Sequence, residues 1–377
     1  MNQSHRVSSR RDFVSSLSAG LGALSLSPLM STAQSIKPLK KSGKLGIALV
    51  GLGNYSSKQL APALLEAKDC YLAGIVTGTK EKERIWSKQY GIKKANIYNY
   101  ENFDSIGSNK DIDIVYVVLP NSMHAEYTIR AANAGKHVIC EKPMALNAAE
   151  AQTMIDACER NGVLLSIGYR LHFDPNTREL MKLAKGKPYG PIKYVQSEAA
   201  FSMGNNLKAW RLNRELAGGG ALMDMGVYCI QASRYSTGEE PIAVRAQEYK
   251  TDWNKFGDVD ETVTWQLEFP SGAYSNSTTS YNLRANRIYV SYAGGSALLE
   301  PGTKYSGISG QVFKGQKLER SLEPQAVNQQ ARQMDGFAQS VRTGTPSIVS
   351  GEEGLRDMKV IDAIYRSLAN GGSRELV

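Results

Sequence analysis

The chain has 377 residues, of which 42% are apolar and 21% charged, so it is long enough for two packed domains and its composition argues against disorder. The formal net charge of +9 is spread along the sequence without a run of four Lys or Arg residues, which argues against a nucleic-acid-binding protein. The longest apolar-leaning stretch, residues 13–30, is broken by serine, glycine and proline residues and is too weakly hydrophobic to span a bilayer. The sequence therefore excludes a polytopic membrane protein.

Residues 1–33 resemble a twin-arginine export signal. Arg10 and Arg11 precede the apolar region, and the small residues that end at Ala33 suit a signal peptidase. We expect cleavage after Ala33, the export machinery as a transient partner, and a periplasmic mature protein without a membrane anchor. A disordered basic tail is the alternative. Because the twin-arginine route carries folded proteins, a cofactor can be loaded before export.

Residues 44–165 are predicted to form a dinucleotide-binding domain. The buried strand expected at 45–50 runs directly into Gly51-Leu52-Gly53, and a helical pattern follows. In this fingerprint the first glycine makes the turn, the second admits the pyrophosphate, and the helix N-terminus attracts its charge. Ser56 occupies the third position, so the match is slightly degraded. Further apolar runs at 71–76, 113–119 and 137–140 alternate with helical segments, which predicts a doubly wound parallel (Rossmann) sheet.

The segment that follows the second predicted strand discriminates between cofactors. A carboxylate at this place would bind the ribose hydroxyl of NAD and repel the extra phosphate of NADP. Residues 77–84 instead begin with small hydroxyl residues and carry several cations. NADP is therefore favoured over NAD, with Thr77 and Lys82 as the expected phosphate contacts. A solvated helix start of mixed charge is the alternative.

Lys142, Asp224 and Tyr228 are the candidate catalytic residues. Lys142 follows the last strand of the first domain, at the edge where this fold class places its ligands, while Asp224 and Tyr228 are four residues apart and share one helical face. Oxidation of a sugar hydroxyl needs a base to remove the proton while hydride leaves, and a cation beside a tyrosine favours the anion that can do so. Tyr228 as a plain core aromatic is the alternative. The four cysteines lack metal-type spacing and are expected to be buried free thiols, and no metal site is predicted.

Several motifs resemble the glucose-fructose oxidoreductase and inositol dehydrogenase family, nearest its glucose-fructose (aldose) oxidoreductase branch. They are Gly51-Leu52-Gly53, Glu141-Lys142-Pro143, Gly168-Tyr169-Arg170-Leu171-His172-Phe173, Trp210-Arg211-Leu212 and residues 218–228. The likeness covers essentially all of the chain after the signal. Much of that family carries histidine four residues after the aspartate, whereas this sequence has Tyr228, as the aldose branch does.

The resemblance implies a role for each matching residue. Tyr228 would be the proton donor and acceptor, Lys142 its electrostatic partner and Asp224 an orienting substrate contact, with Tyr169, Arg170 and His172 facing the sugar. The implied cofactor contacts, joined to those argued above, are Gly51, Gly53, Asn54, Tyr55, Thr77, Lys82, Pro120, Asn121, Glu141, Lys142, Trp210 and Arg211. The lysine-rich leader, residues 34–43, would lie over the adenine end of a tightly held NADP, as the arm of that branch does. A flexible linker is the alternative for the leader.

Residues 166–350 are predicted to form an α+β domain with a large open, mainly antiparallel sheet. Alternating stretches between 192 and 300 predict about six strands, and residues 351–377 a C-terminal helix. An open sheet face predicts a homodimer or homotetramer, as in the resembled family.

Together these features predict a periplasmic, NADP-containing sugar oxidoreductase that oxidises an aldose at C1 to the aldonolactone and passes the hydride to a second sugar, a ketose or an aldose. The alternatives are an NAD-dependent glycosidase of the same fold and a non-catalytic sugar or nucleotide sensor. An acidic residue at the end of the second strand, together with another catalytic pattern, would favour the glycosidase, and neither is present.

Overall fold

The computed structural model describes residues 38–39, 41–204 and 206–377. The predicted export signal, its cleavage site after Ala33 and the first part of the leader lie outside these residues. Among the residues that are described, no helix combines the length and apolarity needed to cross a membrane.

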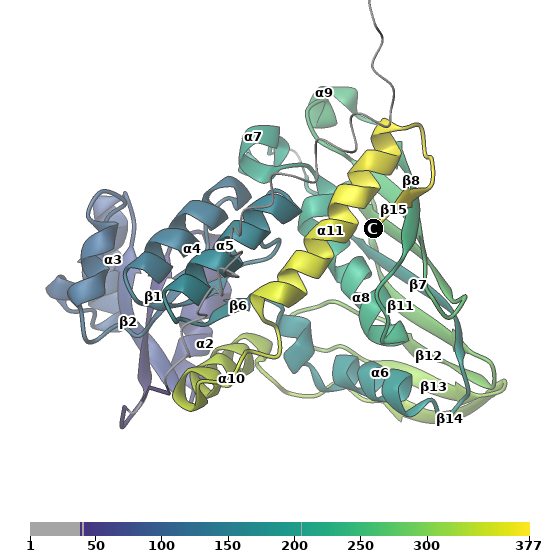
Figure 1. Cartoon of the computed structure of the whole chain (residues 1–377), viewed down its shortest axis with the longest axis horizontal. Helices are drawn as coiled ribbons and strands as arrows, with labels where there is room; N and C mark the ends of the chain where they lie inside the picture. Colours follow the sequence, from purple (N-terminus) through teal and green to yellow (C-terminus); the bar gives the residue numbers. More distant parts are fainter. Residues whose placement is uncertain (1–37, 40, 205) are drawn as a thin grey trace, which may run out of the picture. The chain divides into compact units, whose positions relative to one another are not determined.

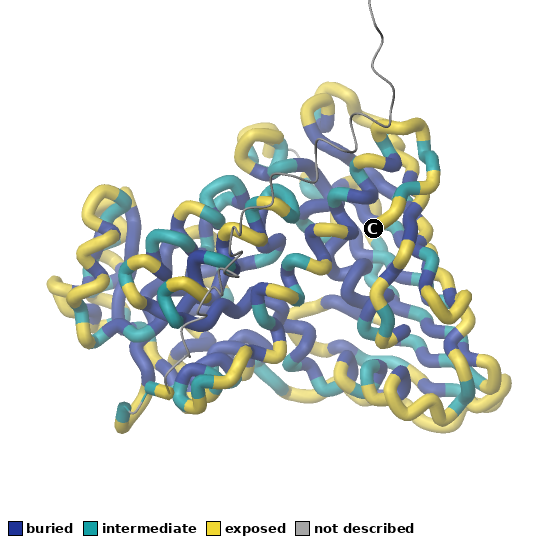
Figure 2. Tube along the Cα trace, in the orientation of Figure 1, coloured by how far each residue is buried: buried dark blue, intermediate teal, exposed yellow. Residues whose placement is uncertain are grey.

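The first domain is built on a six-stranded parallel sheet, as the alternating pattern predicts. The strand order is β3-β2-β1-β4-β5-β6. The strands are β1 (Leu45–Val50), β2 (Cys70–Val76), β3 (Ile97–Tyr98), β4 (Ile114–Val117), β5 (His137–Cys140) and β6 (Leu165–Ile167). Residues of β1, β4, β5 and β6 are buried throughout, which Figure 2 shows as dark tubes, because helices cover both faces of a parallel sheet. The accompanying helices are α2 (Ala61–Glu66), α3 (Lys80–Tyr90), α4 (His124–Asn133) and α5 (Ala148–Arg160).

The turn after β1 requires glycine at its first position. Gly51 has a φ of +90°, and a Cβ there would lie 2.5 Å from the carbonyl oxygen of Val118. Ser56, the apparent defect in the fingerprint, donates its hydroxyl to the carbonyl of Gly51 at 2.6 Å and so closes the turn. Nothing lies within 4 Å of a Cβ built on Gly53, which leaves the backbone open to a ligand.

Helix α10 (Gln329–Thr343) returns from the second half of the sequence to the first sheet. Its residues Met334, Phe337 and Val341 share one buried apolar cluster with Leu45 and Ile47 of β1. Figure 1 shows α10 beside α2. By sequence this helix falls within the predicted second domain, but its apolar face completes the core of the first.

The second domain has a nine-stranded mixed sheet, larger than the predicted sheet of about six strands. Its order is β14-β13-β12-β11-β7-β10-β9-β8-β15, and every neighbouring pair is antiparallel except β7 with β10. The strands are β7 (Ile192–Ala200), β8 (Ala243–Tyr249), β9 (Thr262–Glu268), β10 (Tyr274–Ser280), β11 (Ala285–Tyr292), β12 (Gly295–Leu299), β13 (Gly310–Lys314), β14 (Lys317–Leu322) and β15 (Glu375–Leu376). The three strands that the sequence pattern missed, β13 to β15, are short and half-exposed, so they carry little apolar alternation.

Helices cover one face of this sheet and leave the other open. The covering helices are α6 (Pro175–Gly186), α8 (Val227–Thr237) and α11 (Gly351–Ala369) (Figure 1). A buried ion pair joins two of them, because Arg234 of α8 lies 2.6 Å from Asp357 of α11. Short helices α7 (Arg214–Ala217) and α9 (Trp253–Phe256) and the helical turns η5 (Arg170–Phe173), η6 (Trp210–Leu212) and η7 (Leu222–Gly226) lie between the larger elements in sequence.

Asp260 holds the glycine-rich segment that leads into η7. Its buried carboxylate accepts hydrogen bonds from the backbone N–H groups of Gly220 and Leu222, each at 2.7 Å, and from the hydroxyl of Tyr365 at 2.8 Å. Gly219 and Gly220 are needed because a Cβ on either would lie 1.8 and 2.0 Å from the Tyr365 hydroxyl and the Asp260 carbonyl, respectively. The start of the segment that carries Asp224 and Tyr228 is therefore fixed in place.

Replacement Asp260→Ala should lower the free energy of unfolding by at least about 2 kcal/mol, because it leaves three donors without their carboxylate partner. Asp258→Ala is the control, since Asp258 accepts only the exposed backbone N–H of Arg214, and it should cost less than about 1 kcal/mol. Urea unfolding followed by circular dichroism measures both. Equal losses for the two variants would contradict the role given to Asp260.

Candidate active site

The predicted cofactor residues of the first domain gather at the carboxyl-terminal edge of the parallel sheet. Gly51 follows β1, Thr77 follows β2, and Glu141 and Lys142 follow β5. Because the strands are parallel, these positions share one edge, where open α/β sheets bind their ligands. Asn121, after β4, is buried and donates to the carbonyl of Ala217 at 2.8 Å, which brings the second domain to the same edge.

A cation lies beside the glycine turn. The ammonium of Lys82, on the first turn of α3, donates to the carbonyl of Leu52 at 3.0 Å. Thr77 is buried, and its hydroxyl oxygen accepts from the N–H of Thr79 at 3.2 Å, whereas Gly53 and Asn54 are exposed. An ammonium, a helix N-terminus and an open glycine backbone together fit the phosphates of NADP.

Asp224 is buried between two cations from different segments. Its Oδ1 lies 2.9 Å from Nζ of Lys142, and its Oδ2 lies 2.9 Å from Nε of Arg211 on η6. Burial alone would raise the pKa of Asp224, but Lys142 and Arg211 hold it well below its usual range. Burial likewise opposes charge on Lys142, yet Asp224 raises the pKa of that ammonium. All three side chains are therefore charged.

Tyr228 lies beside this ion pair, at the start of α8. Its ring centroid is 4.8 Å from Nζ of Lys142, and its hydroxyl accepts a hydrogen bond from Nη2 of Arg170 at 3.2 Å. Only 7% of the residue is exposed. The structure thus brings together the three predicted catalytic residues, with a second cation, Arg170, in contact with the phenol oxygen.

Glu141 is positioned by a hydrogen bond from a tyrosine of β4 and, among the described residues, not by an ion pair. Its Oε1 accepts from the hydroxyl of Tyr116 at 2.6 Å, and that hydroxyl accepts from Gln333 of α10 at 2.8 Å. Burial raises the pKa of Glu141. Gly168 allows this placement, because a Cβ there would lie 2.5 Å from Oε1 of Glu141.

Three further aromatic residues belong to the site, and the sequence did not indicate two of them. The hydroxyl of Tyr281 donates to Asp224 at 3.2 Å. Tyr305 lies under the guanidinium of Arg170 at 4.3 Å and faces the ring of Tyr55 at a centroid distance of 5.9 Å. Burial, and after it the neighbouring Tyr228, raises the pKa of Tyr305 to about 12. Tyr281 and Tyr305 follow β10 and β12, far from the site in sequence and without any local motif.

The structure places two of the predicted sugar contacts, Tyr169 and His172, in the core. Tyr169 is 2% exposed and lies in the electrostatic field of Asp357 and Arg234, in the core between α8 and α11. His172 is buried against Tyr235 at a centroid distance of 4.3 Å, and burial lowers its pKa to about 4. Both side chains lie in the core, whereas the adjacent Arg170 reaches Tyr228, so the structure does not bring Tyr169 and His172 together with the three candidate catalytic residues.

The described part of the leader contacts the amino-terminal edge of the parallel sheet, whereas the prediction places it at the carboxyl-terminal edge, where the cofactor would bind. Lys41 forms an ion pair with Asp113 at 2.7 Å, and Lys44 donates to the carbonyl of Ala67 at 2.7 Å. Asp113 precedes β4 and so marks the amino-terminal edge. For Lys41 of the leader the prediction of a cover over the adenine end is wrong, because this lysine is paired with Asp113 at the other edge, and Lys44, directly after the leader, is bonded there as well.

Two further predicted cofactor residues, Trp210 and Pro120, lie next to residues of the site. Trp210 stacks under the guanidinium of Arg211 at 4.5 Å, and Pro120 precedes Asn121 at the edge. The four cysteines are buried free thiols, as predicted. Within the described ranges, no group of three or more His, Cys, Asp and Glu residues is placed to hold a metal ion.

Comparisons with known proteins agree with this architecture. Residues 45–169 match the model of an oxidoreductase family with an NAD-binding Rossmann fold, and residues 177–297 match the GFO/IDH/MocA C-terminal domain. The chain is similar to the crystal structure of the aldose-aldose oxidoreductase of Caulobacter crescentus, with 44% identity and a TM-score of 0.85 over 89% of this chain and all of that one. It is also 28% identical to D-xylose 1-dehydrogenase [NADP(+)] of Haloarcula marismortui, over 85% of this chain and 90% of that protein. D-xylose 1-dehydrogenase (NADP(+)) 2 of Haloferax volcanii is 29% identical over 89% and 99%. The predicted family is thus confirmed, and the chain belongs to the GFO/IDH/MocA family of oxidoreductases.

Proposed function

We propose that the protein is an exported sugar oxidoreductase that holds NADP tightly and passes a hydride between two sugars. An aldose is oxidised at C1 to the aldonolactone, and a second sugar, a ketose or an aldose, is reduced to an alditol. The observation that carries this proposal is the contact of Tyr228 with two buried cations at the dinucleotide-binding edge. The 44% identity to an aldose-aldose oxidoreductase supports the choice of substrates.

The side chains supply the proton chemistry that the reaction needs. Bound NADP supplies the hydride acceptor in the first half-reaction and, once reduced, the donor in the second. Tyr228 removes the proton from the C1 hydroxyl as the C1 hydride leaves, which converts the hemiacetal into the lactone. Nζ of Lys142 lies over the ring of Tyr228, and Arg170 donates a hydrogen bond to its hydroxyl oxygen. Asp224 orients the sugar hydroxyl and holds Lys142 in place.

In the second half-reaction the proton flow reverses. Tyr228 returns its proton to the carbonyl oxygen of the second sugar while the carbonyl carbon of that sugar receives the hydride. Protons and electrons therefore balance over the cycle. Retention of the cofactor follows from the proposed compartment, because no pool of NADP is expected outside the cytoplasm to replenish it. Residues of the second domain, among them Arg211 and Tyr305, reach the nucleotide edge and support such retention.

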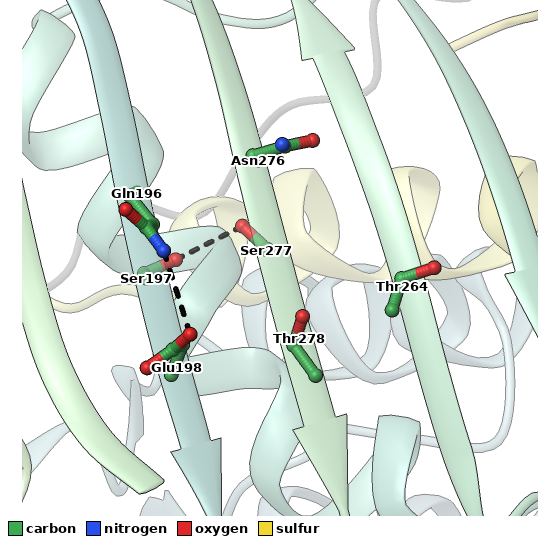
Figure 3. A pocket seen from close by; sticks show the side chains of 7 residues that line it. All are labelled: Gln196, Ser197, Glu198, Thr264, Asn276, Ser277 and Thr278. Atoms are coloured by element: carbon green, nitrogen blue, oxygen red, sulfur yellow. Dashed lines mark hydrogen bonds between the residues drawn. The ribbon is translucent and has the colours of Figure 1, made fainter.

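The open face of the nine-stranded sheet is proposed to bind a second copy of the chain. Among the described residues, no helix covers this face, and its side chains are polar or amphipathic (Figure 3). Glu198 and Arg287 pair across strands β7 and β11, and the rings of Tyr194 and Tyr274 lie 5.0 Å apart. In a two-fold dimer the same face of both copies meets. Because this face carries both signs of charge and several tyrosines, each copy can present complementary groups to the other.

The central experiment uses the mature protein from the periplasmic fraction of expressing cells. It should begin at Gln34, and denaturation should release NADP or NADPH in about equal amount to the protein. Mixing the native protein with an aldose should raise the nicotinamide absorbance, and a second sugar should then reverse the rise without added nucleotide. Release of an aglycone from a glycoside without net reduction would contradict the proposal, as would a protein that exchanges its nucleotide in every turnover.

Replacement Tyr228→Phe should keep the bound nucleotide but lower turnover at least about 100-fold, because the proton acceptor is lost. Tyr235→Phe is the matched control: Tyr235 lies on the same helix, is buried, and has no hydrogen-bond partner among the described residues. Its turnover should match that of the wild type. The measurement is the rate of nicotinamide reduction at saturating aldose. Unimpaired turnover of Tyr228→Phe would remove this residue from its proposed role.

The double replacement Asn276→Glu and Thr278→Glu should convert the proposed dimer into monomers. It adds two carboxylates beside Glu198 on the open face, so like charges meet in the interface. Ser108→Glu, at an exposed position of the first domain, is the control and should leave the assembly unchanged. Size-exclusion chromatography with light scattering measures the mass. A dimer that persists in the double variant would contradict the proposed interface.

A further inference from the structure

Arg170 occupies the junction of four segments around the active site. It lies on η5, is only 4% exposed, and contacts α8, α10 and the loop of residues 300–309 between β12 and β13. These segments come from both halves of the chain. A buried guanidinium at such a junction needs acceptors for its five N–H groups.

The hydrogen-bond acceptors of Arg170 are all neutral. Its Nη1 donates to Oε1 of Gln329 at 2.6 Å and to the carbonyl of Lys304 at 2.9 Å. Its Nη2 donates to the carbonyl of Thr303 at 2.5 Å and to the hydroxyl of Tyr228 at 3.2 Å. The guanidinium also lies over the ring of Tyr305 at 4.3 Å.

This environment distinguishes Arg170 from the other two cations of the site. Lys142 and Arg211 both form ion pairs with Asp224, so their charges are largely compensated by that carboxylate. Among the described residues, Arg170 forms no ion pair with a carboxylate within 4.0 Å. Its uncompensated charge lies at hydrogen-bond distance from the phenol oxygen. Charge-assisted hydrogen bonds of this kind are about twice as strong as neutral ones.

We propose that Arg170 is the positioning residue of Tyr228: its guanidinium fixes the phenol oxygen and stabilises the phenolate. Its bonds to the carbonyls of Thr303 and Lys304 also hold Tyr305, the next residue, beside the sugar. This inference rests on the proposed function, because it assigns a role in the same proton transfer. It also gives Lys142 a different part, which is to neutralise and orient Asp224. The sequence-based expectation that Arg170 contacts the sugar stays a prediction, and the contact with the tyrosine is added to it.

The charged and titratable groups that face Tyr228 come from several elements. Arg170 reaches it from η5 and Lys142 from the end of β5. Tyr55 of the glycine turn and Tyr305 of the loop lie within its electrostatic range. Asp224, in η7 just before α8, is paired with Lys142, and Glu141 is hydrogen-bonded to Tyr116. Removing Arg170 leaves Lys142, already paired, as the nearest cation.

The test is the pH dependence of the first half-reaction in Arg170→Met and Arg170→Lys. The proton acceptor must be ionised, so the rate rises with pH along an acid limb, and loss of a cation moves that limb to higher pH. For Arg170→Met we expect a shift of about one to three pH units, which is a loss of about 10- to 1,000-fold on the acid limb with recovery in alkali. Arg170→Lys, which keeps the charge without the planar fork, should fall between Arg170→Met and the wild type.

Arg130→Met is the control, because Arg130 also stacks on an aromatic ring but pairs with Asp104 on the surface of the first domain. Its acid limb should coincide with that of the wild type. Stopped-flow absorbance of the nicotinamide at saturating aldose measures the rate, and thermal unfolding is recorded in parallel. An Arg170→Met variant that is slower by the same factor at every pH would overturn the inference, since that is the result of a purely structural role.

Two comparisons keep the inference separate from the proposed function. If Arg170→Met does not fold, Arg170→Gln decides, because it removes the charge but keeps a polar side chain, and an unmoved acid limb in that variant overturns the inference. If Tyr228→Phe retains full turnover, the proposed function itself loses its proton acceptor. If Tyr228→Phe is inactive while the acid limb of Arg170→Met stays in place, only the role of Arg170 is wrong.

Discussion

The burial of one carboxylate constrains most of the active site. Asp224 keeps only 14% of its side chain exposed, and its charge persists because Lys142 and Arg211 each contact one of its oxygens at 2.9 Å. Breaking such a buried pair by removing one partner typically costs about 3 to 5 kcal/mol, because the remaining charge is left uncompensated. The lysine comes from the loop after β5 of the nucleotide domain, and the arginine comes from η6, just before α7. The two domains therefore meet at this carboxylate in one geometry.

Other features of the fold serve this placement. Asp260 anchors the glycine-rich segment that precedes Asp224, and the glycines there leave room for the hydroxyl of Tyr365 and the backbone of Asp260. The helical segment that begins with η7 places Tyr228 one turn beyond Asp224, beside the same lysine. Arg170 then reaches the phenol oxygen from the opposite half of the chain. Four separate segments thus converge on one hydroxyl group.

The three cations of the site fall into two groups: Lys142 and Arg211 are paired with Asp224, and Arg170 is not. A lysine and an arginine held by a carboxylate act mainly as a rigid frame, because their field is compensated at short range. An arginine whose acceptors are carbonyl, amide and phenol oxygens keeps its field and directs it at the phenol. A tyrosine in this position can exchange its proton in both directions, as the two proposed half-reactions require.

The sequence alone determined the order of elements, the glycine turn and the family, and it indicated the three candidate catalytic residues. Each depends on short-range patterns: alternation of buried runs, a glycine where the turn at Gly51 needs a positive φ, and the four-residue spacing of Asp224 and Tyr228. The sequence could not determine which of Tyr169, Arg170 and His172 face the site, because adjacent side chains on a short helical turn point in different directions. Nor could it locate Tyr281, Tyr305 and Gln329, since loops and helix starts carry no periodic signal. Only the tertiary structure decided these positions, because contacts between residues 57 to 159 positions apart in the sequence depend on how the two sheets pack around Asp224.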